Sequence, residues 1–81
     1  MENMPKVIRL ADNQYIIKIG GKLIFQSYES TMAVYDTENG FIRLDNNKDN
    51  YTRTTSKYLN MFLRDYCGGI KRKDCTTTNL N

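Results

Sequence analysis

Few side chains in this sequence have the type and spacing that catalysis requires. The chain contains no histidine, which is the commonest general base at neutral pH. Its nine acidic residues fall mainly in turns or near the chain ends, and turn propensity is sufficient to explain them. Cys67 has no neighbouring base that would activate its thiol as a nucleophile. The sequence therefore predicts a protein without enzymatic activity.

Metal-binding and phosphate-binding motifs are also weak. The residues from Asp45 to Asn50 resemble a calcium loop only loosely, because the glycine at the sixth place and the closing glutamate are missing. Gly20-Gly21 lacks the glycine spacing of a phosphate-binding loop, and a tight turn explains the pair. We expect Cys67 and Cys75 to be free thiols, since nothing indicates an oxidising compartment. No metal and no cofactor is expected.

Basic side chains are concentrated in the last part of the chain. The net charge is +3, but residues 1–50 carry six basic and seven acidic side chains, whereas residues 51–81 carry six and two. An excess of positive charge attracts phosphate groups and acidic protein surfaces. We predict a partner-binding site made of basic and tyrosine residues of this region: Tyr51, Arg53, Lys57, Tyr58, Arg64, Lys71, Arg72 and Lys73. The alternative is a solvated helix face followed by a solubilising tail.

The nine aromatic residues must be divided between the core and the surface. Five are expected in the small core: Tyr15, Phe25, Phe41, Phe62 and Tyr66. Four are left for the surface: Tyr28, Tyr35, Tyr51 and Tyr58. Surface aromatics among basic residues could stack nucleic-acid bases, as single-strand binders do. The order of strands and helices does not match the common RNA-binding sheet, so nucleic-acid binding is the weaker alternative.

The elements that must position these side chains begin with short strands. Stretches of β-branched and aromatic residues alternate with turns that contain Gly, Asn or Asp. The expected strands are residues 6–10, 14–19, 22–28, 31–36 and 41–44. Strands joined by short loops pair antiparallel, so one face of the sheet must be covered. We expect the face that carries Tyr15, Ile17 and Ile19 to be the core face.

One amphipathic helix is predicted after the strands, over residues 55–67. Its apolar residues follow the i, i+3, i+4, i+7 spacing: Leu59, Phe62, Leu63 and Tyr66. Thr54, Thr55 or Ser56 can cap its start, and Gly68-Gly69 ends it. A helix of about 12 residues is marginal alone and must dock on the sheet.

These elements predict an α+β fold, with an antiparallel β-meander of four to five strands followed by one C-terminal amphipathic helix packed on one sheet face. Residues 1–69 form the domain, and residues 70–81 are expected to be a disordered basic tail. No stretch approaches the ~20 apolar residues that span a bilayer, and residues 1–5 lack the pattern of a secretory signal. We expect a cytoplasmic monomer or homodimer that does not bind membranes.

Two segments of the chain look familiar. They are residues 25–34, with the sequence FQSYESTMAV, and residues 51–63, with the sequence YTRTTSKYLNMFL. They resemble a group of small bacteriophage-encoded proteins of uncharacterised function, in which a Ser-Tyr-x-Ser/Thr strand is followed by Tyr-Ser/Thr-x-Thr-Thr and a Phe-Leu helix. The resemblance implies a phage or prophage origin, and hence the cytoplasm of an infected bacterium. It implies no particular activity.

The expected function follows from this resemblance and from the missing catalytic groups. We expect a phage-encoded binding protein that inhibits a host defence system, in the manner of anti-CRISPR proteins. Its partner would be a host protein, with a nucleic-acid-guided nuclease complex as the target class and weak nucleic-acid contact at most. The alternatives are a small basic nucleic-acid-binding or regulatory module and a self-assembling accessory protein.

Overall fold

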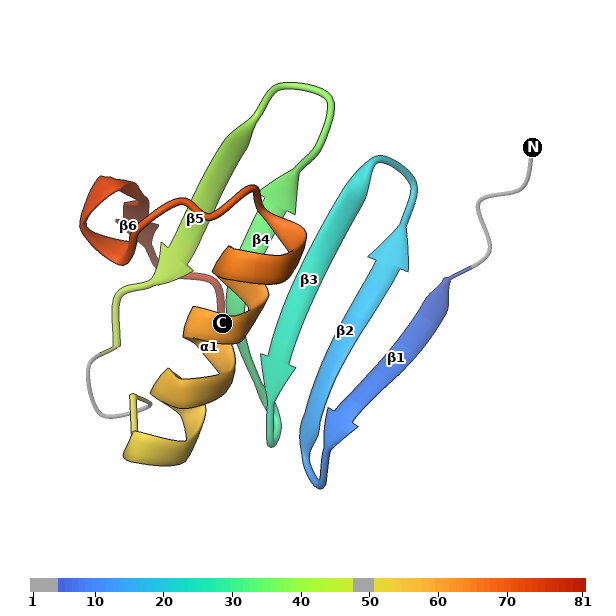
Figure 1. The fold of residues 1–81 in the computed structure, drawn as a ribbon, viewed down its shortest axis with the longest axis vertical. Helices are drawn as coiled ribbons and strands as arrows, with labels where there is room; N and C mark the ends of the chain where they lie inside the picture. The colour runs from blue at the N-terminus through green and yellow to red at the C-terminus, as the bar shows by residue number, and fades with distance from the viewer. Residues whose placement is uncertain (1–4, 48–50) are drawn as a thin grey trace.

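A meander of five antiparallel strands builds most of the fold (Figure 1). The computed structural model describes residues 5–47 and 51–81. The strands are β1 (Lys6–Ala11), β2 (Gln14–Ile19), β3 (Lys22–Ser27), β4 (Ser30–Asp36) and β5 (Phe41–Asp45). Each pairs antiparallel with its neighbour in sequence. The predicted meander and α+β class are therefore confirmed, with strand ends that differ by at most one residue.

The turns between the strands use residues that tolerate a left-handed backbone. Asn13 has φ 64°, Gly20 has φ 59° and Gly40 has φ 75°. Tyr28 also adopts a positive φ of 57°, although its side chain disfavours that region. The Tyr28 N–H donates to the Asn13 carbonyl over 2.7 Å, so two neighbouring turns support each other.

The helix α1 (Arg53–Tyr66) lies across one face of the sheet (Figure 1). Thr52 caps it, because its hydroxyl accepts a hydrogen bond from the Thr55 N–H at 3.2 Å. The prediction of a cap at residues 54–56 is therefore wrong. Thr55 is buried instead, and its hydroxyl lies 2.9 Å from the Ser27 hydroxyl. At the other end, Gly68 has φ 75°, which confirms the predicted glycine stop.

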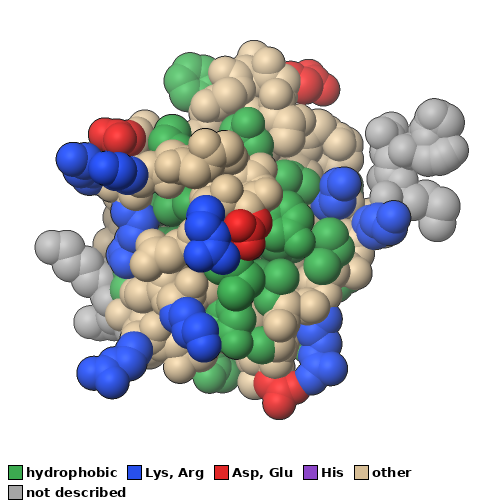
Figure 2. All heavy atoms as spheres, in the orientation of Figure 1, with side chains coloured by type: hydrophobic (Ala, Val, Ile, Leu, Met, Phe, Trp, Pro, Cys, Tyr) green, Lys and Arg blue, Asp and Glu red, His purple; other side chains and the backbone are tan. Residues whose placement is uncertain are grey.

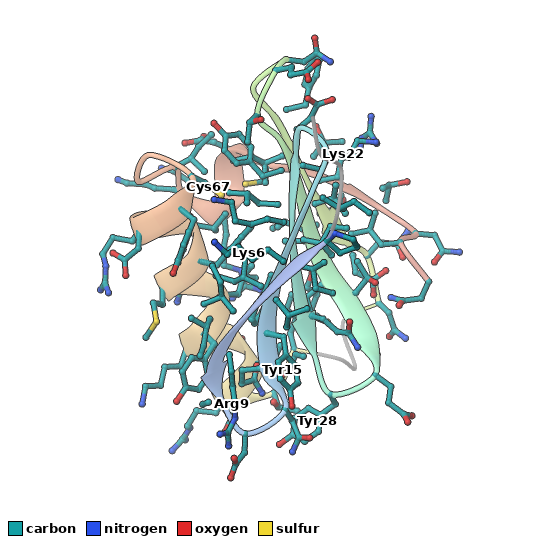
Figure 3. The ribbon with its side chains drawn as sticks, turned by 90° about the vertical axis from the view of Figure 1, so that its right-hand side faces the viewer. Lys6, Arg9, Tyr15, Lys22, Tyr28 and Cys67 are labelled. Carbon is teal, nitrogen blue, oxygen red and sulfur yellow. The ribbon has the colours of Figure 1, made fainter. Side chains whose placement is uncertain are left out.

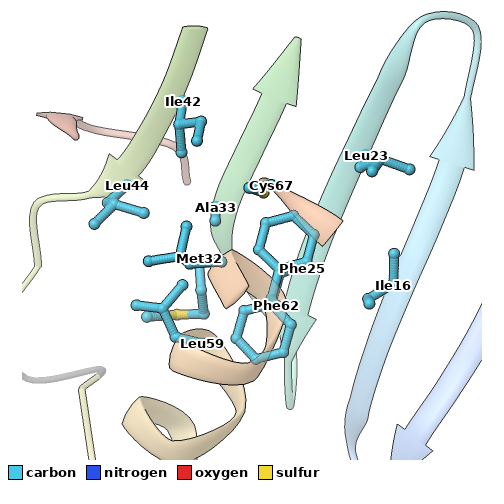
Figure 4. Packing of buried hydrophobic residues seen from close by; sticks show 11 residues of the cluster. Ile16, Leu23, Phe25, Met32, Ala33, Ile42, Leu44, Leu59, Phe62 and Cys67 are labelled. Carbon is cyan, nitrogen blue, oxygen red and sulfur yellow. The ribbon is translucent and has the colours of Figure 1, made fainter. Parts of the chain in front are cut away.

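The core lies between α1 and the sheet. The rings of Phe25 on β3 and Phe62 on α1 are stacked with centroids 5.8 Å apart (Figure 4). A bulge between β3 and β4 lets both Met32 and Ala33 point into this layer, where both are fully buried. Ile16 from β2 completes the cluster on the side of the first hairpin. The helix therefore covers one face of the sheet.

The structure corrects the predicted core in two places. Gln14 and Ile16 of β2 are fully buried, so the core face is the one opposite Tyr15, Ile17 and Ile19. Both faces of β2 carry apolar residues, and only the pairing of Ile16 with buried Phe25 selects between them. Phe41 is 62% exposed rather than buried, because it lies on the face of β5 opposite buried Ile42 and Leu44.

Three tyrosines that were expected on the surface pack partly against the core. They are Tyr35, Tyr51 and Tyr58. Tyr28 does lie on the surface, with 54% of its area exposed. A core this small uses the flat sides of tyrosine rings at its margin, where the hydroxyl still reaches a polar neighbour or solvent.

The C-terminal segment is ordered, and the prediction of a disordered tail is wrong. The short 3-10 helix η2 (Arg72–Asp74) is followed by β6 (Thr76–Thr78), which pairs parallel with β5. The Asn46 N–H donates to the Thr78 carbonyl over 2.8 Å. The segment is polar, which favours disorder by composition, but its threonines are β-branched and suit a sheet edge. The sheet thus has six strands, in the order β1 to β6.

Two expectations from the sequence fall partly outside the described residues. The expectation that residues 1–5 are not a secretory signal involves residues 1–4, and the loose resemblance of Asp45 to Asn50 to a calcium loop involves residues 48–50. Asp45 itself ends β5. No helix among the described residues is long and apolar enough to cross a membrane.

Candidate partner-binding surface

Three of the predicted site residues form a stripe along the outer side of α1. A helix turns about 100° per residue, so Arg53, Lys57 and Arg64 fall within about 40° of one another around its axis. The buried residues Thr55, Leu59, Phe62 and Leu63 centre about 155° away from them. All three basic residues are exposed. We call Arg53, Lys57 and Arg64 the basic stripe, and it points away from the sheet.

The surface around α1 carries more positive than negative charge. Lys and Arg side chains gather over the helix and over the chain end beside it (Figure 2). Arg64 donates to the neighbouring Asp65 through Nε at 2.9 Å and through a terminal nitrogen at 3.2 Å. This hydrogen-bonded pair raises the pKa of Arg64 and lowers the pKa of Asp65. Arg64 is therefore partly neutralised, and Arg53 and Lys57 carry the freer charge of the stripe.

A pocket of about 530 Å³ lies beside the start of α1, where β5, β6 and η2 meet. Three of the predicted site residues line it together: Tyr51, Arg72 and Lys73. The wall is completed by Leu44, Asp45, Asn46 and Thr77. The structure thus brings together residues that are about 20 positions apart in sequence. We call this cavity the Tyr51 pocket.

The side chain of Tyr51 is held from two sides. The guanidinium carbon of Arg72 lies 4.9 Å from the centroid of the Tyr51 ring. The Tyr51 hydroxyl donates a hydrogen bond to the backbone carbonyl of Asp45. Burial, and then the charge of Asp45, raise the pKa of Tyr51, so its phenol stays protonated at neutral pH. A stacked guanidinium keeps its in-plane N–H donors, which suit a carboxylate or phosphate.

Asp45 in the wall of the Tyr51 pocket has a structural role. It is 2% exposed, and its carboxylate accepts hydrogen bonds from the Leu80 N–H at 3.0 Å and the Asn47 N–H at 3.3 Å. These bonds tie the C-terminal segment to the end of β5. In the part of the chain that the structure describes, no three His, Cys, Asp or Glu side chains gather into a possible metal site.

The two cysteines are free and are poor nucleophiles at neutral pH. Burial, with a smaller contribution from Cys75, raises the pKa of Cys67 to about 12. Burial is also the main reason that the pKa of Cys75 is raised. The thiolate is the reactive form of cysteine, and both thiols are protonated at neutral pH.

The other predicted site residues are placed less favourably. Lys71 is exposed beside η2 but does not line the Tyr51 pocket. Tyr58 is half-buried against the core, and the Lys57 ammonium lies 5.4 Å from its ring centroid. The pocket residues that the sequence did not indicate, Leu44 and Thr77, become neighbours only through the pairing of β5 with β6. The three consecutive threonines were the one local signal for that strand.

The fold and this surface define a small α+β protein in which one helix, basic on its outer side, covers a meander sheet. The profile of a family of unknown function, DUF8033, matches residues 2–77. The match spans nearly the whole chain, so the chain belongs to this family. No curated protein and no solved structure matches the chain.

Proposed function

We propose that this protein is a non-catalytic, phage-encoded binding protein that inhibits a host defence system by contact with a host protein, as anti-CRISPR proteins do. The observation that supports it best is the basic stripe on the side of α1 that faces away from the core. The three side chains are exposed, and apart from the pairing of Arg64 with Asp65 their charges are available to an acidic partner. The phage origin and the defence target rest on the resemblance of residues 25–34 and 51–63. The site of action would be the cytoplasm of the infected bacterium.

The size of the helix indicates how much of the surface a partner must contact. A specific protein interface buries about 800 Å² on each partner, which is about a seventh of this molecule's 5414 Å². The 14 residues of α1 span about 21 Å, and with a width of about 10 Å they offer about 210 Å². The helix alone is too small. The partner surface therefore includes the Tyr51 pocket, with Arg72 and Lys73.

The packing of Tyr51 argues against a partner that stacks nucleic-acid bases on this ring. A nucleic-acid base needs an open aromatic face on which to stack. The ring of Tyr51 is half-buried and is already in contact with Arg72. An acidic side chain or a phosphate can bind the N–H donors of Arg72 without displacing it from the ring, so the salt dependence of binding must separate these two partners.

Charge reversal on the helix tests the binding surface. Arg53→Glu with Lys57→Glu and Arg64→Glu should abolish capture of a host protein from nuclease-treated lysate of the host bacterium. The matched control reverses Lys6, Lys18 and Lys22, which are also exposed but lie on β1, β2 and β3. This control has the same net charge and should keep the partner. Equal loss in both variants would show that only net charge matters and would contradict the proposal.

The salt dependence of binding separates the two partner classes. A protein that neutralises four phosphates loses affinity roughly a hundredfold between 50 and 200 mM salt, because counterions are released. We expect the captured host protein to lose less than about tenfold over that range. Binding that disappears after nuclease treatment, or that follows the steep slope, would favour the nucleic-acid-binding module instead.

A plaque assay tests the inhibitory activity itself. Expression of the wild-type protein should raise plaque formation in a bacterium that restricts phage by an RNA-guided nuclease, and the basic-stripe variant should not. The control variant should act like the wild type. If the folded wild-type protein binds its partner but leaves restriction unchanged, the binding surface stands and the inhibitory function is wrong.

A further inference from the structure

The face of the sheet opposite α1 carries an apolar row across four strands. Register places Val7, Ile17, Ile24 and Val34 side by side on β1 to β4. Val7 is 61% exposed, and the other three are partly exposed. Phe41 and Ile19 extend the apolar area toward the next row, with exposures of 62% and 38%. We call this side of the sheet the open face.

Little of the chain covers the open face. Figure 3 views the sheet along its β1 edge, with α1 on one side only. Within residues 5–47 and 51–81, the contact on the other side comes from the chain end, where the Asn81 amide bonds the backbone of Thr31 at 2.9 and 3.1 Å and the Leu80 N–H bonds Asp45. These contacts lie at one corner, and the apolar row is left accessible.

The strand sequences themselves are typical of a sheet that is covered on both faces. An antiparallel sheet with one wet face shows alternating apolar and polar residues, whereas a sheet buried on both faces shows continuous apolar runs. Here β2 contains Tyr15-Ile16-Ile17, β3 contains Leu23-Ile24-Phe25, and β4 contains Ala33-Val34-Tyr35. Neighbouring residues in a strand point to opposite faces, so one helix can cover only every second residue of each apolar run.

We propose that the open face binds a second copy of this chain, giving a homodimer in which two sheets pack face to face and the two α1 helices lie outermost. Its centre is the Val7, Ile17, Ile24 and Val34 row. Sheets packed in this way lie about 10 Å apart and interdigitate their side chains.

The area of the open face fits a modest dimer. Strands lie about 4.8 Å apart, so five strands span about 24 Å, and three rows along the strands cover about 20 Å. This gives about 480 Å² per copy and about 960 Å² for the pair, which is the size of a weak, transient interface. An interface of this size is consistent with a dissociation constant in the micromolar range.

The charges on the open face also suit a second copy. Lys22 and Asp36 are cross-strand partners at one end of the face, so both signs occur there. Arg9 at the other end is already paired with Asp12. The apolar row ends at exposed Arg43 on β5, the cross-strand partner of Val34, so the uncharged centre is confined to Ile17, Ile24 and Val34, and Arg43 belongs to the polar rim that is usual at protein interfaces. Two copies can therefore meet without placing unpaired charge in the middle.

Sedimentation equilibrium tests the dimer. The wild-type protein should pass from monomer to dimer between about 1 μM and about 1 mM. Ile24→Lys places two like charges at the centre and should weaken association at least about a hundredfold. Asn60→Lys adds the same charge on the exposed side of α1 and should leave association unchanged. A wild-type protein that stays monomeric over this range would overturn the proposal.

Methyl NMR locates the interface and does not depend on the variant folding. On dilution of the wild-type protein, the methyl shifts of Ile17, Ile24 and Val34 should change together, while those of Ile42 and Leu59 in the core should not. Dimerisation with unchanged shifts at Ile17 and Ile24 would assign the contact to another surface and overturn the proposal. Because the assay uses this chain alone, its outcome is independent of the proposed host partner.

Discussion

The two faces of the sheet have similar side chains but different surroundings. On the covered face, Phe25 stacks on Phe62 of α1, and both rings are fully buried. On the open face, Val7 and Phe41 are more than half exposed. The comparison shows that apolar side chains alone do not make a face of the sheet part of the core. A face is buried only where another element packs on it, and α1 packs on one face only.

The largest expected difference comes from removing one phenylalanine ring on each side of the sheet: Phe62 of α1 on the covered side and Phe41 of β5 on the open face. Phe62→Ala should lower the free energy of unfolding by about 3–5 kcal/mol, since it removes a fully buried ring and leaves a cavity. Phe41→Ala should change it by less than about 0.5 kcal/mol, because that ring is mostly exposed in the monomer. Urea titration of both variants at protein concentrations below about 1 μM, where the proposed dimer is dissociated, gives the comparison. Equal losses would mean that the open face is part of a monomer core.

A smaller effect is expected from the polar contact that joins the two layers. The Ser27 and Thr55 hydroxyls lie 2.9 Å apart and are both buried. Ser27→Ala should cost about 1–2 kcal/mol, because Thr55 then loses one of its buried partners. In a double-mutant cycle with Thr55→Val, the second change should cost less once Ser27 is gone. Strict additivity of the two losses would show that the hydroxyls do not interact.

A cap comparison on the helix distinguishes the observed start from the expected one. Thr52→Ala should cost about 1 kcal/mol, because the Thr55 N–H loses its acceptor. Thr54→Ala, at an exposed site within the first turn, should stay within about 0.5 kcal/mol of the wild type. Thermal melts of the two variants decide between them. A larger loss of stability from Thr54→Ala than from Thr52→Ala would indicate that the helix is capped at Thr54, as the sequence predicted, and not at Thr52.

The sequence predicted the local features of the covered face better than its long-range ones. The helix stripe of Leu59, Phe62 and Leu63 and the stop at Gly68 are local patterns, and the structure confirms them. The choice between the faces of β2 is not local, because residues 15, 16 and 17 are all apolar. Register with β3 and the position of α1 make that choice, and neither can be read from β2 itself.

The candidate site shows the same division. The basic stripe follows from helix periodicity, so the sequence alone places Arg53, Lys57 and Arg64 on one side. The Tyr51 pocket depends on the parallel pairing of β5 with β6. Residues 70–81 are polar, and composition predicted disorder for them. Two hydrogen bonds order this segment: the Leu80 N–H donates to the Asp45 carboxylate, and the Asn46 N–H donates to the Thr78 carbonyl. Each joins residues more than 30 positions apart in sequence.

The smallest effect at neutral pH, and a distinct one at alkaline pH, is expected at Cys67 on the covered side. Burial raises its pKa from 9.0 to about 12, so the folded state holds the thiol proton more tightly than the unfolded chain does. The stability that this provides is complete below pH 9 and is lost as the pH rises from about 9 toward 12.

Cys67→Ala removes this titration and leaves the other alkaline groups in place. The variant should be somewhat less stable than the wild type at pH 7, because a buried side chain is shortened. Between pH 8 and about pH 11, the wild type should lose more stability than the variant, so the difference between their melting temperatures should narrow. Cys75→Ala, at a partly exposed site on the chain end, is the matched control. The difference between its melting temperature and that of the wild type should narrow less over this pH range. A constant difference across that range would mean that Cys67 is solvated in the folded state, and that the covered face is looser around the end of α1 than its packing indicates.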